Sequence, residues 1–510
     1  MEHRSGILWA AILASWVAAT VLLASRLLAH AASATTIPLI VLVLLALSFF
    51  VLVGFFNIAV NVASRILREK PATQPPRGTP RVAVLYCTMN DFVLPSAETL
   101  LRLSYPRVDL WILDDSSEPR ARDRVDAFVR DAAVPGRPVH LVRRNLRRGY
   151  KAGAINNVLG VLPRDVEYVA IVDADERLPA GFIQDCLPYF SAPDIAFVQA
   201  NHYCVNTDEG WFTRYLGVGV DLHWRHYQRY RNRYGTVNML GHGAVVRRDV
   251  LEELGGFPEV TCEDLAFTAT ARGAGYRGVF AFDVLCGETF PSTFSAMRKR
   301  HLRWCAGTVE FLRHYAVAFA RSPARLHEKL DLLLPSLNLP SALLLLSFVL
   351  AVQGLWRAGE VTLLTDPVLL TLGVLAGAAP LCVFADLFRR PGFAIKTIAI
   401  NTFAYLALFP LSVVGVLRGL VRPAQFVVTP KGPGWSQGVG ATLKESVVDM
   451  AFGVGLLSLG YQIGGTVGLL SPLALASLAS PALILASGRR TTGLSTARSP
   501  RAIGPPEDPP

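Results

Sequence analysis

Two aspartates one residue apart, Asp173 and Asp175, follow the apolar run Val169 to Val172 near the middle of this 510-residue chain. The run is rich in β-branched residues and predicts a buried strand, so both carboxylates stand at a strand end. Mg²⁺ and Mn²⁺ bind such hard oxygen ligands, often together with the phosphates of a substrate. The pair therefore indicates a site for a divalent metal and a nucleotide diphosphate. Taken alone, an Asp-x-Asp string is more often an ordinary solvated strand end.

Strand-like and helix-like runs alternate around this pair. Strands are expected at Arg81 to Cys87, Asp109 to Leu113, Val139 to Val142, Tyr168 to Val172 and Ile195 to Gln199. The alternation predicts an α/β domain with a mostly parallel sheet, which binds ligands at the carboxyl ends of its strands. Asp114 and Asp115 end one of these strands, as Asp173 and Asp175 end another. We therefore expect the two acidic pairs to lie at one edge of the sheet.

Long apolar segments on both sides of this domain indicate a membrane protein, in keeping with a composition that is 52% hydrophobic and 17% charged. A membrane span needs about 20 apolar residues. Six spans are expected, at Gly6 to Leu28, Ile37 to Val62, Leu330 to Trp356, Asp366 to Phe388, Val447 to Leu470 and Pro472 to Ser487. The segment Phe393 to Leu420 is also apolar, but Pro410 interrupts it and basic residues flank it at both ends, so we expect a reentrant or interfacial segment against the cytoplasmic leaflet.

The distribution of basic residues predicts the orientation of the chain. Arg65 and Lys70 follow the second span, whereas the loop from Ala29 to Thr36 has neither lysine nor arginine. By the positive-inside rule, the α/β domain and both termini are expected in the cytoplasm, with the spans in the inner membrane. The expected organisation is a hairpin at 1–63, a linker at 64–80, the α/β domain at 81–308, interfacial and membrane helices at 309–488, and a disordered tail at 489–510.

The formal net charge of +11 does not make this a nucleic-acid-binding protein, because much of the excess lies beside the spans, where basic residues set topology. No nucleic-acid partner is expected. The seven cysteines are scattered and never form a C-x-x-C pair, which argues against both a zinc site and a disulfide framework.

The order of several short motifs carries a family resemblance. The motifs are Asp114-Asp115, Arg148 to Asn156 (RGYKAGAIN), Asp173-Ala174-Asp175, Cys262-Glu263-Asp264 and Arg303-Trp304. In this order they resemble the inverting family 2 glycosyltransferases of GT-A (Rossmann-like) fold, specifically the membrane-embedded cellulose and hyaluronan synthase-like branch. The flanking segments Pro291 to Phe294 and Trp304 to Gly307 are similar to those of plant mannan and glucan synthase-like enzymes.

The resemblance implies roles for the acidic motifs. Asp114 and Asp115 would belong to the nucleotide-sugar site, with Lys151 near Asp115. Asp175 would hold Mg²⁺ or Mn²⁺, with Asp173 as its partner toward the nucleotide sugar. Inverting transfer needs a base that takes the proton of the acceptor hydroxyl, and the family places it at Asp264, with Glu263 in support. The alternative from spacing alone is that Glu263 and Asp264 cap a helix from Leu265 to Gly273.

Other motifs imply contacts to the diphosphate and the acceptor. Arg303 would bind the diphosphate and Trp304 would stack on the terminal acceptor sugar. Arg300 and His301 stand at the first two positions of the family's Gln-(Gln/Arg)-x-Arg-Trp motif, and neither matches it. Arg298 and Lys299 are expected to face lipid headgroups. His242 stands where cellulose synthases have a Cys-Gly-Ser/Thr segment; it is an acceptor-site candidate, although a lone histidine is more often a packing residue.

A gating-loop motif lies further along the chain. Residues 426–431, Phe-Val-Val-Thr-Pro-Lys, fit the Phe-x-Val-Thr-x-Lys loop of cellulose synthase-like enzymes, which implies that Phe426, Thr429 and Lys431 close over the nucleotide sugar. The expected function is inverting, metal-dependent transfer of a hexose, with UDP-glucose as the expected donor, to a growing exopolysaccharide β-glycan that is exported. A nonprocessive enzyme with a lipid-linked acceptor and a transporter with a degenerate nucleotide-sugar domain are the alternatives. The expected partners are the nucleotide sugar, the glycan acceptor and the lipid bilayer. An accessory export subunit is a further candidate partner.

Overall fold

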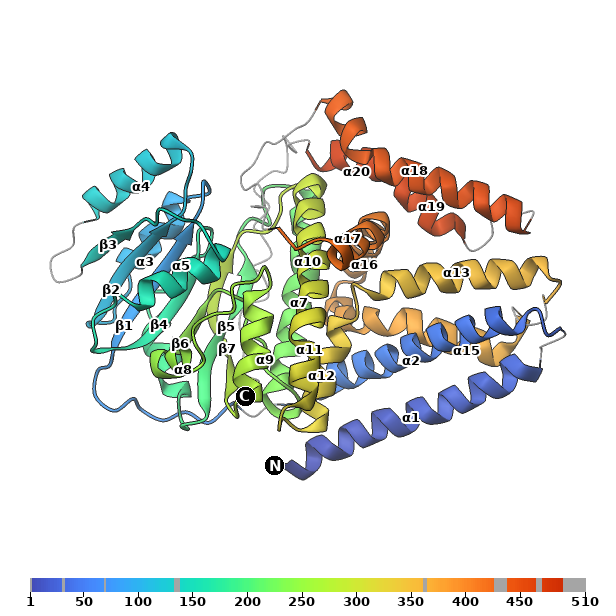
Figure 1. Cartoon of the computed structure of the whole chain (residues 1–510), viewed down its shortest axis with the longest axis horizontal. Coiled ribbons are helices and arrows are strands. Elements are labelled where there is room, and N and C mark those ends of the chain that lie inside the picture. The colour runs from blue at the N-terminus through green and yellow to red at the C-terminus, as the bar shows by residue number, and fades with distance from the viewer. Residues whose placement is uncertain are drawn as a thin grey trace.

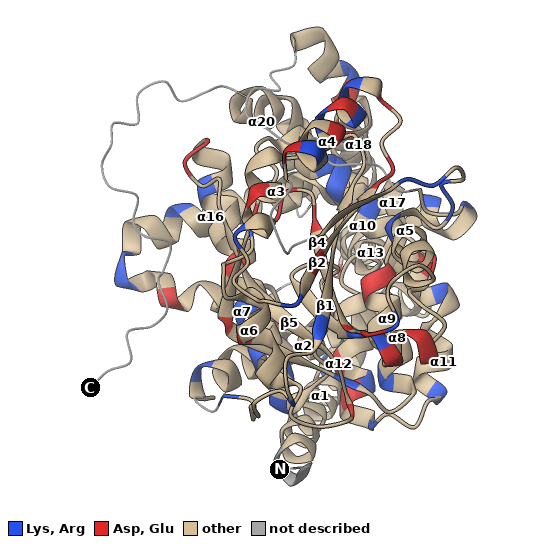
Figure 2. Ribbon diagram, turned by 90° about the vertical axis from the view of Figure 1, so that its left-hand side faces the viewer, with Lys and Arg blue, Asp and Glu red and all other residues tan. Residues whose placement is uncertain are grey.

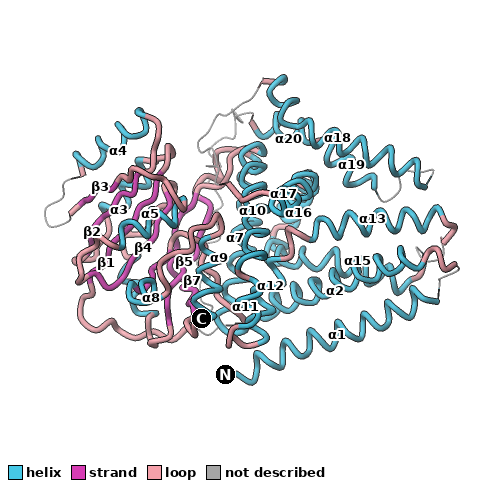
Figure 3. Tube along the Cα trace, in the orientation of Figure 1, coloured by secondary structure: helices cyan, strands magenta, loops and turns pink. Residues whose placement is uncertain are grey.

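The computed structural model describes residues 2–29, 33–67, 70–132, 138–360, 365–425, 438–464 and 470–488. An α/β domain forms one end of the molecule, long helices form the other, and several upright helices stand between them (Figure 1). All strands lie in the α/β domain, and the opposite end is entirely helical in the part of the chain that is described (Figure 3). The predicted insertion of an α/β domain between apolar helices is confirmed.

A seven-stranded sheet runs through the α/β domain in the order β3-β2-β1-β4-β6-β5-β7. The strands are β1 Arg81–Thr88, β2 Val108–Asp114, β3 Val139–Val142, β4 Val166–Asp173, β5 Ile195–Cys204, β6 Ala244–Arg247 and β7 Arg277–Glu288. β3, β2, β1 and β4 are parallel, and β5 and β7 are parallel to each other, whereas β6 is antiparallel to both β4 and β5. The mostly parallel α/β sheet is therefore confirmed, with one reversed strand that the sequence did not indicate.

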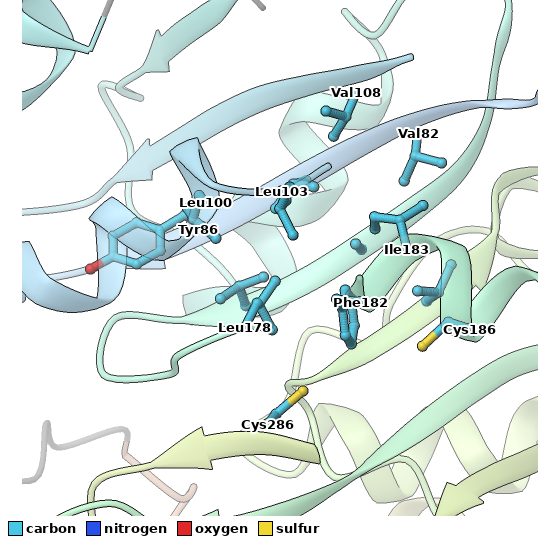
Figure 4. Packing of buried hydrophobic residues seen from close by; sticks show 14 of the residues in the cluster. Val82, Tyr86, Leu100, Leu103, Val108, Leu178, Phe182, Ile183, Cys186 and Cys286 are labelled. Atoms are coloured by element: carbon cyan, nitrogen blue, oxygen red, sulfur yellow. The ribbon is translucent and has the colours of Figure 1, made fainter. Parts of the chain in front are cut away.

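Buried apolar strands make the core on both faces of the sheet. β2 is buried at every position and β1 at most of its positions, which explains their continuous apolar sequences. On one face, Tyr86 of β1 and Val108 of β2 pack with Leu100 of α3 and with Phe182 and Cys186 of α6 (Figure 4). This rigid core fixes the strand ends at which the acidic residues stand.

The helices fall into three groups. The α/β domain contains α3 Leu94–Leu101, α4 Pro119–Asp131, α5 Tyr150–Leu159, α6 Phe182–Cys186, η1 Leu187–Tyr189, α8 Arg248–Glu253 and α9 Glu263–Gly273. The upright helices are α7 Trp211–Tyr234, α10 Phe294–His314, α11 Ala316–Arg321 and α12 Leu326–Ser336. The apolar end contains α1 Glu2–Ala29, α2 Ile37–Ile66, α13 Ser341–Arg357, α15 Pro367–Ala378, η2 Ala379–Arg389, α16 Pro391–Ala407, α17 Phe409–Val421, α18 Val439–Gly464, α19 Ser471–Leu478 and α20 Ser480–Ser487.

Four described helices are long and apolar enough to cross a membrane, and three bent pairs bring the number to as many as seven. The four are Ser5–Ala29, Ile37–Ile66, Pro367–Arg389 and Val439–Ile463. The expected third span is not one straight helix, because α12 and α13 meet at 67°. Pro340 at the bend lacks a backbone N–H and favours the break. The segment expected to be reentrant or interfacial forms α16 and α17, which are bent by 44° and are seen nearly end-on where the long helices run across the view (Figure 1).

Charged residues of both signs are distributed over the α/β domain when it is viewed from that side (Figure 2). One charged group belongs instead to the helix interface. Arg298 of α10 is buried, with its guanidinium 2.5 Å from Asp449 and 3.2 Å from Glu445, both on α18. The expectation that Arg298 faces lipid headgroups is therefore wrong, because two carboxylates on a distant helix bury and neutralise it.

Candidate active site

A cavity of about 460 Å³ lies at the carboxyl ends of the central strands. Its lining includes Asp115 after β2, Asp173 and Asp175 at the end of β4, and the start of α9 and the middle of α10. The sequence-predicted residues that line it are Asp115, Lys151, Asp173, Asp175, His242, Glu263, Asp264, Arg303 and Trp304. Motifs spread over much of the chain thus meet around one space.

Asp173 is held by a lysine from a neighbouring helix. Gly149, with φ of +70°, turns the chain into α5 and brings Lys151 into the first turn of that helix. The ammonium of Lys151 pairs with the Asp173 carboxylate and donates to the carbonyl of Gly241 at 2.7 Å. Burial opposes the charge on Lys151, but the carboxylate of Asp173 outweighs it and raises the pKa of the lysine above its usual range. Lys151 therefore pairs with Asp173, and it lines the same cavity as Asp115, near which the resemblance placed it.

Asp173 and Asp175 offer carboxylate oxygens, the ligand type that Mg²⁺ and Mn²⁺ prefer. Asp175 is almost fully buried and lines the cavity next to Asp173. Both carboxylates line the cavity, so Asp175, with Asp173 beside it, is placed where it could hold a metal beneath a diphosphate. The residues present fit the expected cation.

The two aspartates after β2 differ in their surroundings. Asp114 is buried, pairs with Arg143 at 2.7 Å and accepts a hydrogen bond from the backbone of Ser116. Asp114 is not among the residues that line the cavity, so it is not placed to contact a nucleotide sugar there directly. Asp115 does line the cavity, and Arg144 fixes its carboxylate at 2.5 Å. Only Asp115 is placed to contact a nucleotide.

Two buried carboxyl groups, Glu263 and Asp264, stand in the first turn of α9. Cys262 is the N-cap residue and makes no side-chain capping bond, while the carboxylate of Asp264 accepts a hydrogen bond from the backbone N–H of Leu265 at 2.7 Å. The helix thus begins before the expected Leu265. Burial raises the pKa of both carboxyl groups, and repulsion by Asp264 raises that of Glu263 further. A carboxylate with a raised pKa, facing a cavity, is suited to accept a proton.

α10 supplies the aromatic and basic side of the cavity. Trp304 is 38% exposed, large for a tryptophan, and faces the cavity. The guanidinium of Arg300 lies 4.5 Å from the Trp304 ring centroid, and Arg303 also lines the cavity. His301 instead points away and lies 2.7 Å from the hydroxyl of Ser412 on α17. The two residues that depart from the family motif therefore differ in location. Arg300 lines the cavity, whereas His301 lies in the packing between α10 and α17.

A group of residues that the sequence did not reveal surrounds His242. The ring lies 3.5 Å from the buried carboxylate of Glu176 and 3.8 Å from Glu288, and His202 of β5 is 3.0 Å from Glu176. Burial opposes protonation, but Glu288 and Glu176 outweigh it and raise the pKa of His242 to about 10. His242 is therefore part of a polar cluster at the cavity. His242 was a candidate from the sequence, and the position of Glu176 directly after the Asp-x-Asp motif is a signal that could have added it.

The gating-loop residues Phe426, Thr429 and Lys431, and the tail 489–510, lie outside the described residues. The chain just before the loop reaches the start of α5, because the hydroxyl of Tyr150 lies 3.5 Å from the carbonyl of Ala424.

Comparisons with known proteins agree with this arrangement. Residues 168–417 match the family described as Glycosyl transferase family group 2. A protein of Oryza sativa subsp. japonica named "Probable glucomannan 4-beta-mannosyltransferase 9" is 32% identical over 225 residues, which are 43% of this chain and 42% of that protein. Glucomannan 4-beta-mannosyltransferase 9 of Arabidopsis thaliana is 31% identical over 220 residues, 42% of this chain and 41% of that protein. The matches thus span less than half the length of these relatives.

Among solved structures, the mannosyltransferase PcManGT from Pyrobaculum calidifontis in complex with GDP-Man and Mn²⁺ is 20% identical, with a TM-score of 0.49, over 74% of this chain and 99% of that one. The family match covers β4 to α17 and so includes the Asp173/Asp175 pair, both carboxyl groups of α9, and Arg303-Trp304. The half of the chain from β4 to α17 therefore matches the family described as Glycosyl transferase family group 2, and it carries strands β4 to β7 of the α/β sheet.

Proposed function

We propose that this protein transfers a hexose, with inversion, from a nucleotide diphosphate sugar to a growing β-glycan. The observation that carries the proposal is the convergence of a metal-type carboxylate, a candidate base and an aromatic platform, Asp175, Asp264 and Trp304, on one cavity. A domain that only bound nucleotide sugars would have no need for the base and the platform.

Each group has a part in the reaction. Asp115 would bind the nucleoside end of the donor, and Arg303 would bind the diphosphate. Mg²⁺ or Mn²⁺ held by Asp175 would offset the charge of the diphosphate as it leaves. Trp304 would stack on the acceptor sugar, so that its hydroxyl faces the anomeric carbon from the side opposite the diphosphate. Asp264 would take the hydroxyl proton as the new bond forms.

The relatives' names favour a mannosyl donor. Both plant relatives are named as glucomannan 4-β-mannosyltransferases, and we extend this to the present chain in place of the UDP-glucose expected from sequence. The proposed product is therefore a β-linked mannose-containing glycan.

The shape of the cavity supports extrusion of the product between helices. Besides Trp304, its lining includes Trp224 and Tyr227 of α7, Pro335 of α12, and Leu339 in the turn that follows α12. These helices lie between the α/β domain and the apolar helices (Figure 1), and aromatic side chains are suited to stack on sugar rings. We propose that the growing chain leaves this way across the membrane.

Radiolabelled GDP-mannose and UDP-glucose, offered separately to the purified protein, test the proposal. We expect mannose to enter a polymer that an endo-β-mannanase degrades. Incorporation into a short organic-soluble product would instead support the lipid-linked acceptor. No transfer from any nucleotide sugar, together with retained nucleotide binding, would support a degenerate binding domain and refute the proposed function.

A further inference from the structure

Glu176, His202 and His242 form a compact cluster beside the candidate active site. One ligand-type atom from each, a carboxylate oxygen or an imidazole nitrogen, lies within 4.8 Å of the other two. The oxygen Oε1 of Glu176 is 3.0 Å from Nε2 of His202 and 3.5 Å from Nδ1 of His242. Ligand atoms bound tetrahedrally at about 2.0–2.1 Å from a zinc ion stand about 3.3–3.4 Å apart, and the two distances from Glu176 lie on either side of this value.

We propose that Glu176, His202 and His242 bind a divalent transition-metal ion, separate from the ion at Asp175. Two imidazoles and one carboxylate are a set that suits Zn²⁺ or Co²⁺, whereas the all-oxygen pair Asp173 and Asp175 suits Mg²⁺ or Mn²⁺. The set uses no cysteine, so the scattered cysteines do not bear on it. The inference rests on the cluster alone and goes beyond the proposed function.

The surroundings hold the ligand atoms in place. The second oxygen of Glu176 accepts hydrogen bonds from the backbone N–H of Gly243 at 3.0 Å and of Asp173 at 3.3 Å, which leaves Oε1 directed at the two rings. Gly243 has φ of +58°, and a Cβ there would lie 2.4 Å from both Glu176 and His202. Only glycine lets the backbone pack so closely against the cluster.

An outer carboxylate completes the arrangement. Glu288 lies 3.8 Å from Nε2 of His242, on the side of the ring away from Glu176. A carboxylate behind a histidine is the usual partner that orients a metal-bound imidazole. Glu176 and Glu288 together also supply the negative charge that a buried divalent cation requires.

Nδ1 of His242 is buried and has no hydrogen bond of normal geometry within the described residues, although it faces Glu176. A bound ion would give this atom a partner. His202, His242 and Glu288 all line the cavity, so the fourth coordination position would open toward the substrates. Catalytic zinc ions typically keep such a position open for the oxygen of a water molecule or a substrate.

Cobalt titration of the full-length protein tests the site without any nucleotide sugar, so the outcome is independent of the proposed transferase activity. Protein stripped of metal is titrated with Co²⁺, bound metal is counted by mass spectrometry, and Zn²⁺ is added in competition. We expect one tightly bound Co²⁺ per chain, with the visible absorption of tetrahedral cobalt, displaced by Zn²⁺.

Three variants locate the ion. His202→Gln keeps an amide donor for Glu176 but loses the imidazole, and should weaken Co²⁺ binding at least about 100-fold, the upper end of the cost of losing a second-shell partner. Asp175→Asn should retain the ion. His226→Gln is the matched control, because His226 is also buried and paired with a carboxylate, Asp386 at 2.9 Å, but lies on α7 outside the cluster.

Three results would overturn the proposal: no stoichiometric Co²⁺ in the wild-type protein, equal affinity in His202→Gln, or loss of the ion in Asp175→Asn. The last would assign the ion to the aspartate pair. An unchanged circular dichroism spectrum of His202→Gln ensures that lost binding is not lost folding.

Discussion

Replacing Asp264 by asparagine is the sharpest test of the proposed chemistry. Asparagine has nearly the same size as aspartate. Its side-chain carbonyl oxygen can still accept the hydrogen bond that Asp264 accepts from the N–H of Leu265 at 2.7 Å. The substitution also removes one of two buried carboxyl groups whose pKa values burial raises, so the folded state should lose no stability. What it removes is the proton acceptor.

The loss of a general base typically slows a reaction by about 10²–10⁴-fold, equivalent to about 2.7–5.4 kcal/mol of barrier at 1.36 kcal/mol per tenfold. Asp264→Asn should therefore lower kcat by at least about 10²-fold. Calorimetry should show GDP binding near that of the wild type, since Asp115 and Arg303 are untouched. The matched variant Glu263→Gln should cost much less, because Glu263 supports the base without accepting the proton.

The pH dependence gives a second readout. A base must be ionised to act, and burial raises the pKa of Asp264, so wild-type kcat/KM should begin to fall at a pH above the ordinary aspartate pKa of about 3.9. An Asp264→Asn enzyme that keeps most of its rate would refute the assignment.

Three further predictions concern the metal, the helix interface and the loop. Asp175→Asn should abolish transfer, EDTA should do the same to the wild type, and Mg²⁺ or Mn²⁺ should restore only the wild type; full activity of the wild type in excess chelator would contradict this. Arg298→Met should lower the free energy of unfolding by about 3–5 kcal/mol because it leaves Asp449 buried and unpaired, and adding Asp449→Leu should recover part of the loss, as thermal denaturation would show. Single cysteines at Gln425 and Gly434, in a chain without other cysteines, should resist an impermeant maleimide in intact cells and react after permeabilisation, whereas labelling in intact cells would place the loop outside.

Local sequence determined the strands and their chemistry. The strands β2 and β4, which end just before Asp115 and Asp175, are largely buried because a mostly apolar sequence suits both faces of an inner strand. Placement of acidic residues at carboxyl ends then follows, since neighbouring parallel strands end at one edge. The length of their apolar segments likewise predicted α1 and α2, because a helix that crosses a bilayer needs about 20 apolar residues in a row.

Only the tertiary structure decided which side chains meet. Asp114 turned away to Arg143 while Asp115 entered the cavity, although the two are adjacent in sequence. Arg298 found its partner on α18 rather than at the membrane surface, and His202 came beside Glu176 through the pairing of β5 with β6. Local periodicity carries information about which face a residue occupies, but a contact between remote residues depends on how whole elements pack. For that reason the strand ends could be predicted from the chain, whereas the histidine cluster and the buried arginine could not.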